Sequence, residues 1–118
     1  MKKGDILYVN LTQRNGKNIT KGRRLCIVIS NDKHNSTSET LTVLPMSSKT
    51  YKKNNKYNIF LAFDEEALSE VLYKDNIVLI SQIRTIDTCN VIRKIASVDT
   101  ESKWFKFLIR KVVNYLND

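Results

Sequence analysis

The sequence predicts a mainly β domain: a small, strongly curved barrel with one C-terminal helix packed against it. Five or six short apolar segments rich in β-branched residues follow one another, separated by polar stretches. The hydrophobic spacing changes to that of a helix only after residue 98. With 118 residues, 42% of them hydrophobic, the chain can bury one modest core. Because no repeat or linker divides it, residues 1–118 are expected to form a single domain.

The expected strands follow from runs of apolar and β-branched residues. The first, Asp5–Leu11, alternates, with Ile6 and Tyr8 on one side. The second, Arg23–Ser30, has the near-continuous apolar character of a buried central strand. Further strands are expected at Thr40–Met46, Tyr57–Ala62, Asn76–Ile83 and Val91–Val98.

The last segment has the spacing of an amphipathic helix, and Asp99 is a candidate N-cap. Its packed face is expected to contain Trp104, Leu108, Val112, Tyr115 and Leu116, with Phe105 and Ile109 beside them. The basic residues between them would then be solvated rather than form a binding surface: Lys103, Lys106, Arg110 and Lys111.

Positive charge is concentrated in two polar segments. The chain has 20 Lys and Arg residues against 12 acids, a net charge of +8. Nine of these cations lie in residues 13–24 and 49–56, whereas acids gather in residues 64–75. This segregation favours a polyanionic partner such as nucleic acid, the alternative being charge that only keeps a small protein soluble.

Several classes of function are excluded by what the sequence lacks. No apolar targeting segment follows Met1, and the apolar runs are too short to span a bilayer, so a cytoplasmic protein is expected. Cys26 and Cys89 are then thiols without metal-binding spacing, and no cofactor is expected. One histidine, His34, excludes a two-histidine ribonuclease within one chain. Acids gathered in one connection do not form a two-metal site.

Four segments resemble the MazF/PemK family of toxin endoribonucleases (mRNA interferases), in the same order and over nearly the whole chain. They are GDILYVNL, GRRLCIVISND, VLPMSS and NIVLISQIRTID. The resemblance implies an SH3-like barrel of the MazF/PemK/CcdB type that forms a homodimer. It also implies cleavage of single-stranded RNA (mRNA) at short sequences without a metal, and restraint by an acidic, partly disordered antitoxin.

By position, the resemblance assigns the catalytic roles to Arg24 and Ser47. A guanidinium is always ionised and can stabilise the extra negative charge on a phosphate in the transition state. A hydroxyl can hold a reacting oxygen in line. RNA-binding residues are expected among Arg14, Lys17, Lys21, Arg23, Ser48, Lys49, Lys52, Lys53, Ser81 and Gln82. The alternative is that the two arginines only mark a strand end on the surface.

The sequence also departs from the family pattern. Leu25 stands where many relatives have proline, and Ser47 where threonine is commoner. Ser81 replaces a frequent carboxylate, and Leu79 an arginine that some relatives have, which leaves base preference open.

Two other functions remain open at this point. One is a non-catalytic poison like the gyrase-binding CcdB toxins, although those depend on apolar C-terminal residues and this chain ends in Tyr115–Asp118. The other is an SH3-like module that binds RNA without cutting it. Arg84 and Asp87 are expected to brace a strand end, and Gln82 to read a base edge or satisfy backbone at a dimer seam.

Overall fold

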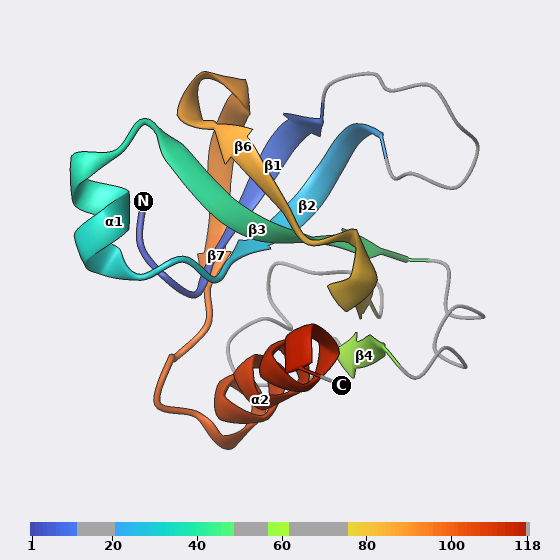
Figure 1. Ribbon diagram of the computed structural model, residues 1–118. Coiled ribbons are helices and arrows are strands. Elements are labelled where there is room, and N and C mark those ends of the chain that lie inside the picture. The colour runs from blue at the N-terminus through green and yellow to red at the C-terminus, as the bar shows by residue number, and fades with distance from the viewer. Residues whose placement is uncertain (12–20, 49–56, 62–75, 118) are drawn as a thin grey trace.

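The computed structural model describes residues 1–11, 21–48, 57–61 and 76–117 (Figure 1). It is mainly β with a C-terminal helix, which confirms the predicted class. The elements, in order, are β1 (Asp5–Leu11), β2 (Gly22–Val28), α1 (Asp32–Thr37), β3 (Thr40–Ser47), β4 (Asn58–Leu61), β5 (Asn76–Leu79), the 3-10 helix η3 (Ile80–Gln82), β6 (Arg84–Asp87), the 3-10 helix η4 (Thr88–Asn90), β7 (Val91–Ser97) and α2 (Lys103–Asn117).

All strand pairs are antiparallel, and β3 is the centre of the sheet. The strand order is β4-β5-β3-β2-β1-β7, and β6 also pairs with β3. β6 lies along residues 40–43 of β3, whereas β5 pairs with Met46 and Ser47 farther along. In Figure 1, β6 can be followed along β3, with which it pairs over the first half of that strand. The described strands curl without closing, since no pair among them joins β4 to β7.

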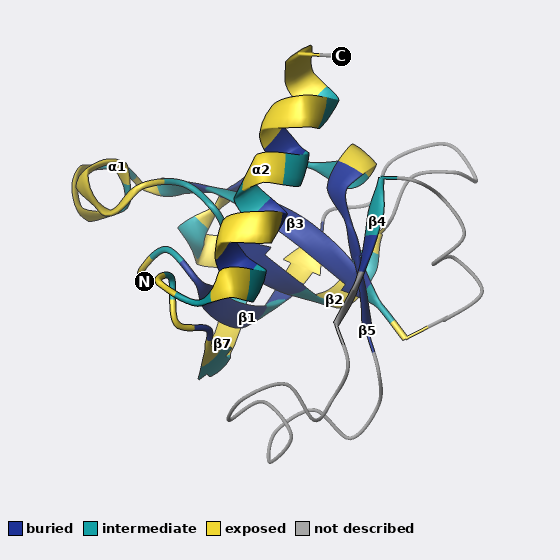
Figure 2. Cartoon of the chain, turned by 90° about the horizontal axis from the view of Figure 1, so that it is seen from below, coloured by how far each residue is buried: buried dark blue, intermediate teal, exposed yellow. Residues whose placement is uncertain are grey.

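Strand alternation divides the apolar side chains between two clusters. One lies among the strands and contains Leu7, Val9, Leu11, Cys26, Val28, Leu41, Val43 and Ile86; here it is called the strand cluster. The other, the helix cluster, joins the opposite face of the sheet to α2 and includes Ile6, Ile27, Leu44, Met46, Val78, Ile80, Phe105, Leu108 and Val112. Figure 2 shows β3 buried and the outer side of α2 exposed. The two faces of β2 and β3 therefore have different neighbours.

The structure differs from the prediction at one strand and adds one helix. The apolar run Asn76–Ile83 is not one strand, because β5 ends at Leu79 and η3 turns the chain into β6. The turn lets two short strands pair with different parts of β3. The helix α1 was not predicted; Asn31 caps it by accepting a hydrogen bond from His34 N at 2.8 Å. His34 is exposed on this helix.

The predicted start of the C-terminal helix is corrected by three residues. Ser102 caps α2, since its Oγ accepts from Phe105 N at 3.1 Å, whereas Asp99 Oδ1 accepts from Glu101 N in the preceding turn. Leu116 is 64% exposed, so it does not belong to the packed face. The predicted solvated residues Lys103, Lys106 and Arg110 are exposed, and Lys111 is half-buried.

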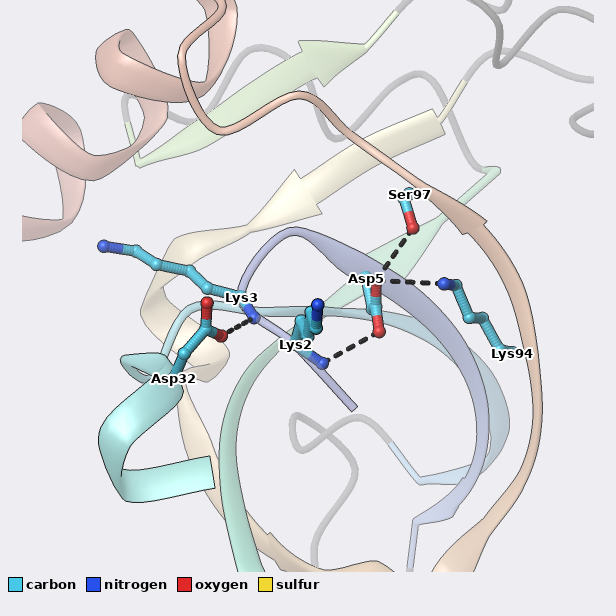
Figure 3. A network of polar contacts seen from close by, with 6 residues as sticks. All are labelled: Lys2, Lys3, Asp5, Asp32, Lys94 and Ser97. Carbon is cyan, nitrogen blue, oxygen red and sulfur yellow. Dashed lines mark hydrogen bonds and ion pairs between the residues drawn. The ribbon is translucent and has the colours of Figure 1, made fainter. Parts of the chain in front are cut away.

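The Gly-Asp opening of the chain fastens the N-terminal end of β1 (Figure 3). Gly4 has φ +90° and pairs with Val28 O and Val98 N, and an added Cβ would lie 2.7 Å from Val98 O. Asp5, 4% exposed, accepts hydrogen bonds from Lys2 N at 2.9 Å and from Ser97 Oγ at 2.8 Å. These contacts tie β1 to β7.

Both cysteines are free thiols, Cys26 buried in β2 and Cys89 exposed in η4. No helix in the described part of the chain is long and apolar enough to cross a membrane.

Candidate active site

Arg24 and Ser47 lie where β2 and β3 separate. The two strands pair from Val28–Val43 to Cys26–Pro45. Beyond that last pair β2 continues beside β1, and β3 continues beside β5. Arg24 and Ser47 are each two residues past the last shared pair, so strand alternation places them on the same face as Cys26 and Pro45. The fold therefore brings the two predicted catalytic residues to one fork and one face.

The side chains at this fork are accessible and polar. Arg24 is exposed, and its Nη1 donates to the carbonyl oxygen of Arg23 at 3.4 Å, a long and weak contact. Among the described residues no carboxylate forms an ion pair with it. Ser47 is half-buried at the end of β3. The fork thus carries a guanidinium on one strand and a hydroxyl on the other, two groups that can donate hydrogen bonds to an anion.

Cys26 is the buried residue beneath the site. Burial raises the pKa of its thiol to about 12, while the positive charges of Arg84 and Arg24 lower it in part. The thiol is therefore neutral at physiological pH, and both guanidinium groups are close enough for their charge to act on it. Sequence reasoning did not place Arg84 at this site.

Arg84 belongs to β6, which pairs with the edge of β3 opposite to β2. It starts β6 opposite Val43, and strand alternation puts it on the face of Ile86, within the strand cluster. Its Nη2 donates to Gln82 Oε1 at 3.4 Å. The alternation of Arg84 and Ile86 is visible in the sequence, but the strand that they belong to was not predicted.

Asp87, which was expected with Arg84 to brace a strand end, has a local role. Asp87 Oδ1 accepts from Cys89 N at 2.8 Å and caps η4. This backbone hydrogen bond lowers the pKa of the Asp87 carboxyl. Asp87 therefore stabilises the end of β6, as predicted, but does so without Arg84.

The predicted RNA-binding residues differ in exposure and in the face that they occupy, and several lie outside the described residues. Lys21, Arg23, Ser48 and Ser81 are exposed and Gln82 is half-buried. Arg23, however, alternates with Arg24 and projects from the face of Leu25 and Ile27, which pack in the helix cluster. Arg14, Lys17, Lys49, Lys52 and Lys53 lie outside the described residues, as do the acids of residues 64–75 that precede β5.

Solved structures with the same fold are MazF toxins and related endoribonucleases. MazF from Deinococcus radiodurans matches with a TM-score of 0.77 and 18% identity, over 100% of this chain and 97% of that one. A MazE–MazF complex from the same organism gives 0.72 and 17%, over 99% and 96%. An endoribonuclease with its cognate antitoxin, from a mycobacterial species, gives 0.74 and 10%, over 99% and 95%. These similarities confirm the predicted barrel-like fold.

The sequence itself supports a closer assignment. No curated protein sequence matches the chain. Residues 2–103, however, match the family model described as PemK-like, MazF-like toxin of type II toxin-antitoxin system. The match spans the four segments on which the resemblance was based, up to the first residue of α2. The chain therefore belongs to the PemK-like, MazF-like toxin family of type II toxin–antitoxin systems.

Proposed function

We propose that this toxin is an endoribonuclease that cleaves single-stranded RNA, mRNA in the cell, at short sequences and without a metal ion. The observation that carries the proposal is the fork of β2 and β3, where Arg24 and Ser47 share one face. Family membership adds support, as does the fold of the mycobacterial endoribonuclease. The proposed substrate agrees with the net charge of +8.

The proposed reaction uses a nucleophile that the RNA itself supplies. The oxygen of the ribose 2′ hydroxyl bonds to the adjacent phosphorus as the bond from phosphorus to the 5′ oxygen breaks. The 2′ hydroxyl gives its proton to water, and the departing 5′ oxygen takes up a proton from water. Negative charge grows on the non-bridging phosphate oxygens in the transition state. The Arg24 guanidinium, fixed on a central strand, donates two parallel hydrogen bonds to those oxygens. It therefore stabilises the transition state more than the bound substrate, which is the requirement for catalysis.

Ser47 has a positioning role in this scheme. Its hydroxyl donates to a non-bridging oxygen or holds the 2′ hydroxyl in line with the bond that breaks. Because the nucleophile belongs to the substrate and Arg24 supplies the positive charge, no metal is needed to activate water.

Recognition and regulation extend beyond the fork. Ser81, which replaces a carboxylate found in relatives, and Gln82 are proposed to set base preference. The basic segments at residues 13–24 and 49–56, doubled in a homodimer, would follow the RNA backbone. We further propose an acidic, partly disordered antitoxin that competes with RNA in the cytoplasm, because related toxins have been solved in complex with antitoxins.

The test compares two neighbouring arginines on opposite faces of β2. Arg24→Ala is expected to lower kcat by about 10²- to 10³-fold on a mixed-sequence RNA, since it removes a donor to the developing charge. Arg23→Ala removes the same charge one residue away and is expected to raise KM while kcat stays near wild type. Thermal unfolding should be nearly unchanged for both, because both side chains are exposed.

The same assay includes the hydroxyl and the non-catalytic alternatives. Ser47→Ala is expected to lower kcat less than Arg24→Ala, and Ser48→Ala serves as its neighbouring control. Wild-type cleavage by a folded Arg24→Ala protein would reject the proposed chemistry. RNA that is bound but left intact by the wild-type protein would instead indicate a binding module.

A further inference from the structure

Arg84 supplies a second guanidinium on the face of the proposed RNA path, from the strand at the opposite edge of β3. β3 lies between β2, which carries Arg24, and β6, which begins with Arg84. Val43 pairs with β2 on one edge and with Arg84 on the other. Arg24 and Arg84 therefore project from the same face of three adjacent strands.

The buried thiol of Cys26 lies within range of both guanidinium charges. Cys26 is two residues from Arg24 on β2, and its partner Pro45 is two residues from Val43 on β3. The thiol therefore sits between the two starting points. The charges of both Arg84 and Arg24 act on it, that of Arg84 more strongly.

Gln82 limits where the Arg84 guanidinium can point. Its Oε1 accepts from Arg84 Nη2 at 3.4 Å, and Gln82 itself belongs to η3, which follows the β5 strand paired with Ser47. Arg84 is half-buried, and a guanidinium stays protonated at physiological pH. Two guanidinium groups on one face of the sheet can each donate hydrogen bonds to a phosphate of a polyanion.

We infer that Arg84 binds an RNA phosphate next to the one on which Arg24 acts, with Gln82 as the residue that positions it. The two arginines start from strands on opposite sides of β3, so successive phosphates suit them better than one shared phosphate. This inference rests on the proposed function, because it assumes that the polyanion at the fork is RNA. Arg84 is thus a substrate-binding residue rather than a member of the catalytic pair.

The test measures binding separately from cleavage. An RNA with 2′-deoxy sugars cannot be cut by the proposed route, so its affinity can be titrated at several salt concentrations. Arg84→Gln is expected to weaken binding about tenfold, and to lower the slope of log K against log salt by about 0.7, the value for one single-strand phosphate. Its kcat on saturating cleavable RNA is expected to stay within about threefold of wild type. Arg84→Lys should restore the slope but only part of the affinity, since lysine lacks the planar fork.

Two further variants make the result specific. Arg93→Gln removes an equal charge from an exposed β7 residue that pairs with Tyr8, on the other face of the sheet, and should leave the slope unchanged. Gln82→Leu removes the hydrogen bond to Arg84 but keeps the charge of Arg84. It should therefore reduce affinity about threefold and leave the slope of log K against log salt unchanged. If Arg84→Gln fails to fold, Arg84→Lys decides alone: affinity equal to wild type would overturn the inference.

The outcomes separate the inference from the proposed function. A wild-type protein that cleaves RNA, with Arg84→Gln and Arg93→Gln equal in affinity and slope, rejects the Arg84 contact and leaves the Arg24 chemistry. A wild-type protein that binds RNA without cutting it, with the slope reduced only for Arg84→Gln, rejects the nuclease and supports the contact. A wild-type protein that does not bind RNA rejects both.

Discussion

Replacing Asp5 with alanine is expected to destabilise the fold substantially while leaving the chemistry at the fork intact. Asp5 is almost fully buried, and its two carboxylate oxygens accept from Lys2 N and Ser97 Oγ at 2.9 and 2.8 Å (Figure 3). Lys94 Nζ adds an ion pair at 3.5 Å. Asp5 is the first residue of β1, whereas Val9, which pairs with Arg24 of β2, lies farther along the strand.

The size of the loss follows from these contacts. A hydrogen bond to a charged group contributes about 1.5–3 kcal/mol, so two of them give about 3 kcal/mol at the low end of that range. The Lys94 pair adds about 1 kcal/mol or less, because the lysine side chain is largely exposed. For a domain of this length, about 3 kcal/mol lowers the melting temperature by roughly 12 °C.

Calorimetry or denaturant unfolding measures this loss, and a second aspartate supplies the control. Asp32 Oδ1 accepts from Lys3 N at 2.7 Å, but it is exposed, so Asp32→Ala should cost about 1 kcal/mol or less. Ser97→Ala should fall between the two. An Asp5→Ala variant that loses no more stability than Asp32→Ala, or that no longer cleaves RNA at a temperature where it is folded, would contradict this role of Asp5.

Two other predictions concern pH and metals. The pKa of Cys26 is raised by burial from the ordinary value of 9.0 to about 12. The stability linked to the neutral thiol is therefore complete below pH 9 and is lost as pH rises toward 12, by up to about 1.4 kcal/mol per pH unit. Cys26→Ala should remove this component, so parallel pH curves for the two proteins would contradict it. Cleavage should continue in excess EDTA, and loss on chelation that magnesium restores would reverse the proposed mechanism.

Much of the strand pattern could be predicted because apolar alternation is a local signal. β1, β3 and β7 begin and end within a residue of the expected positions. The break between β5 and β6 was not visible, because no glycine or proline interrupts the run from Asn76 to Asp87. That break is imposed by β3, which offers separate pairing positions to each strand, and tertiary pairing of this kind leaves no local mark.

α1 was not predicted, and the start of α2 was placed three residues too early, for different reasons. α1 has a recognisable cap at Asn31, but its six residues are polar and bury none of their side chains, so no apolar period marks it. At α2 both Asp99 and Ser102 are good N-caps, and Asp99 caps the preceding turn instead. A choice between two adequate caps is decided by how the chain leaves β7.

The candidate site, too, could be predicted from the sequence only in part. Arg24 and Ser47 were found from the resemblance and from the chemistry of a guanidinium and a hydroxyl, and each lies at a strand end as expected. That they share a face depends on the register of β2 and β3. The opposite orientation of Arg23 and the approach of Arg84 depend on alternation within strands whose limits were not known in advance.

The separation of β2 and β3 has a consequence for genetics. Arg24 is carried by a strand that β1 supports, whereas Ser47 is carried beside β5, so their spacing depends on the angle at which β3 leaves β2. Met46 of β3 and Val78 of β5 belong to the same buried cluster as Phe105 of α2, and this cluster supports that angle. Selection for survivors of toxin expression should therefore recover substitutions in this buried cluster that keep Arg24 and Ser47 but change their spacing. Suppressor mutations that restore toxicity should arise in α2.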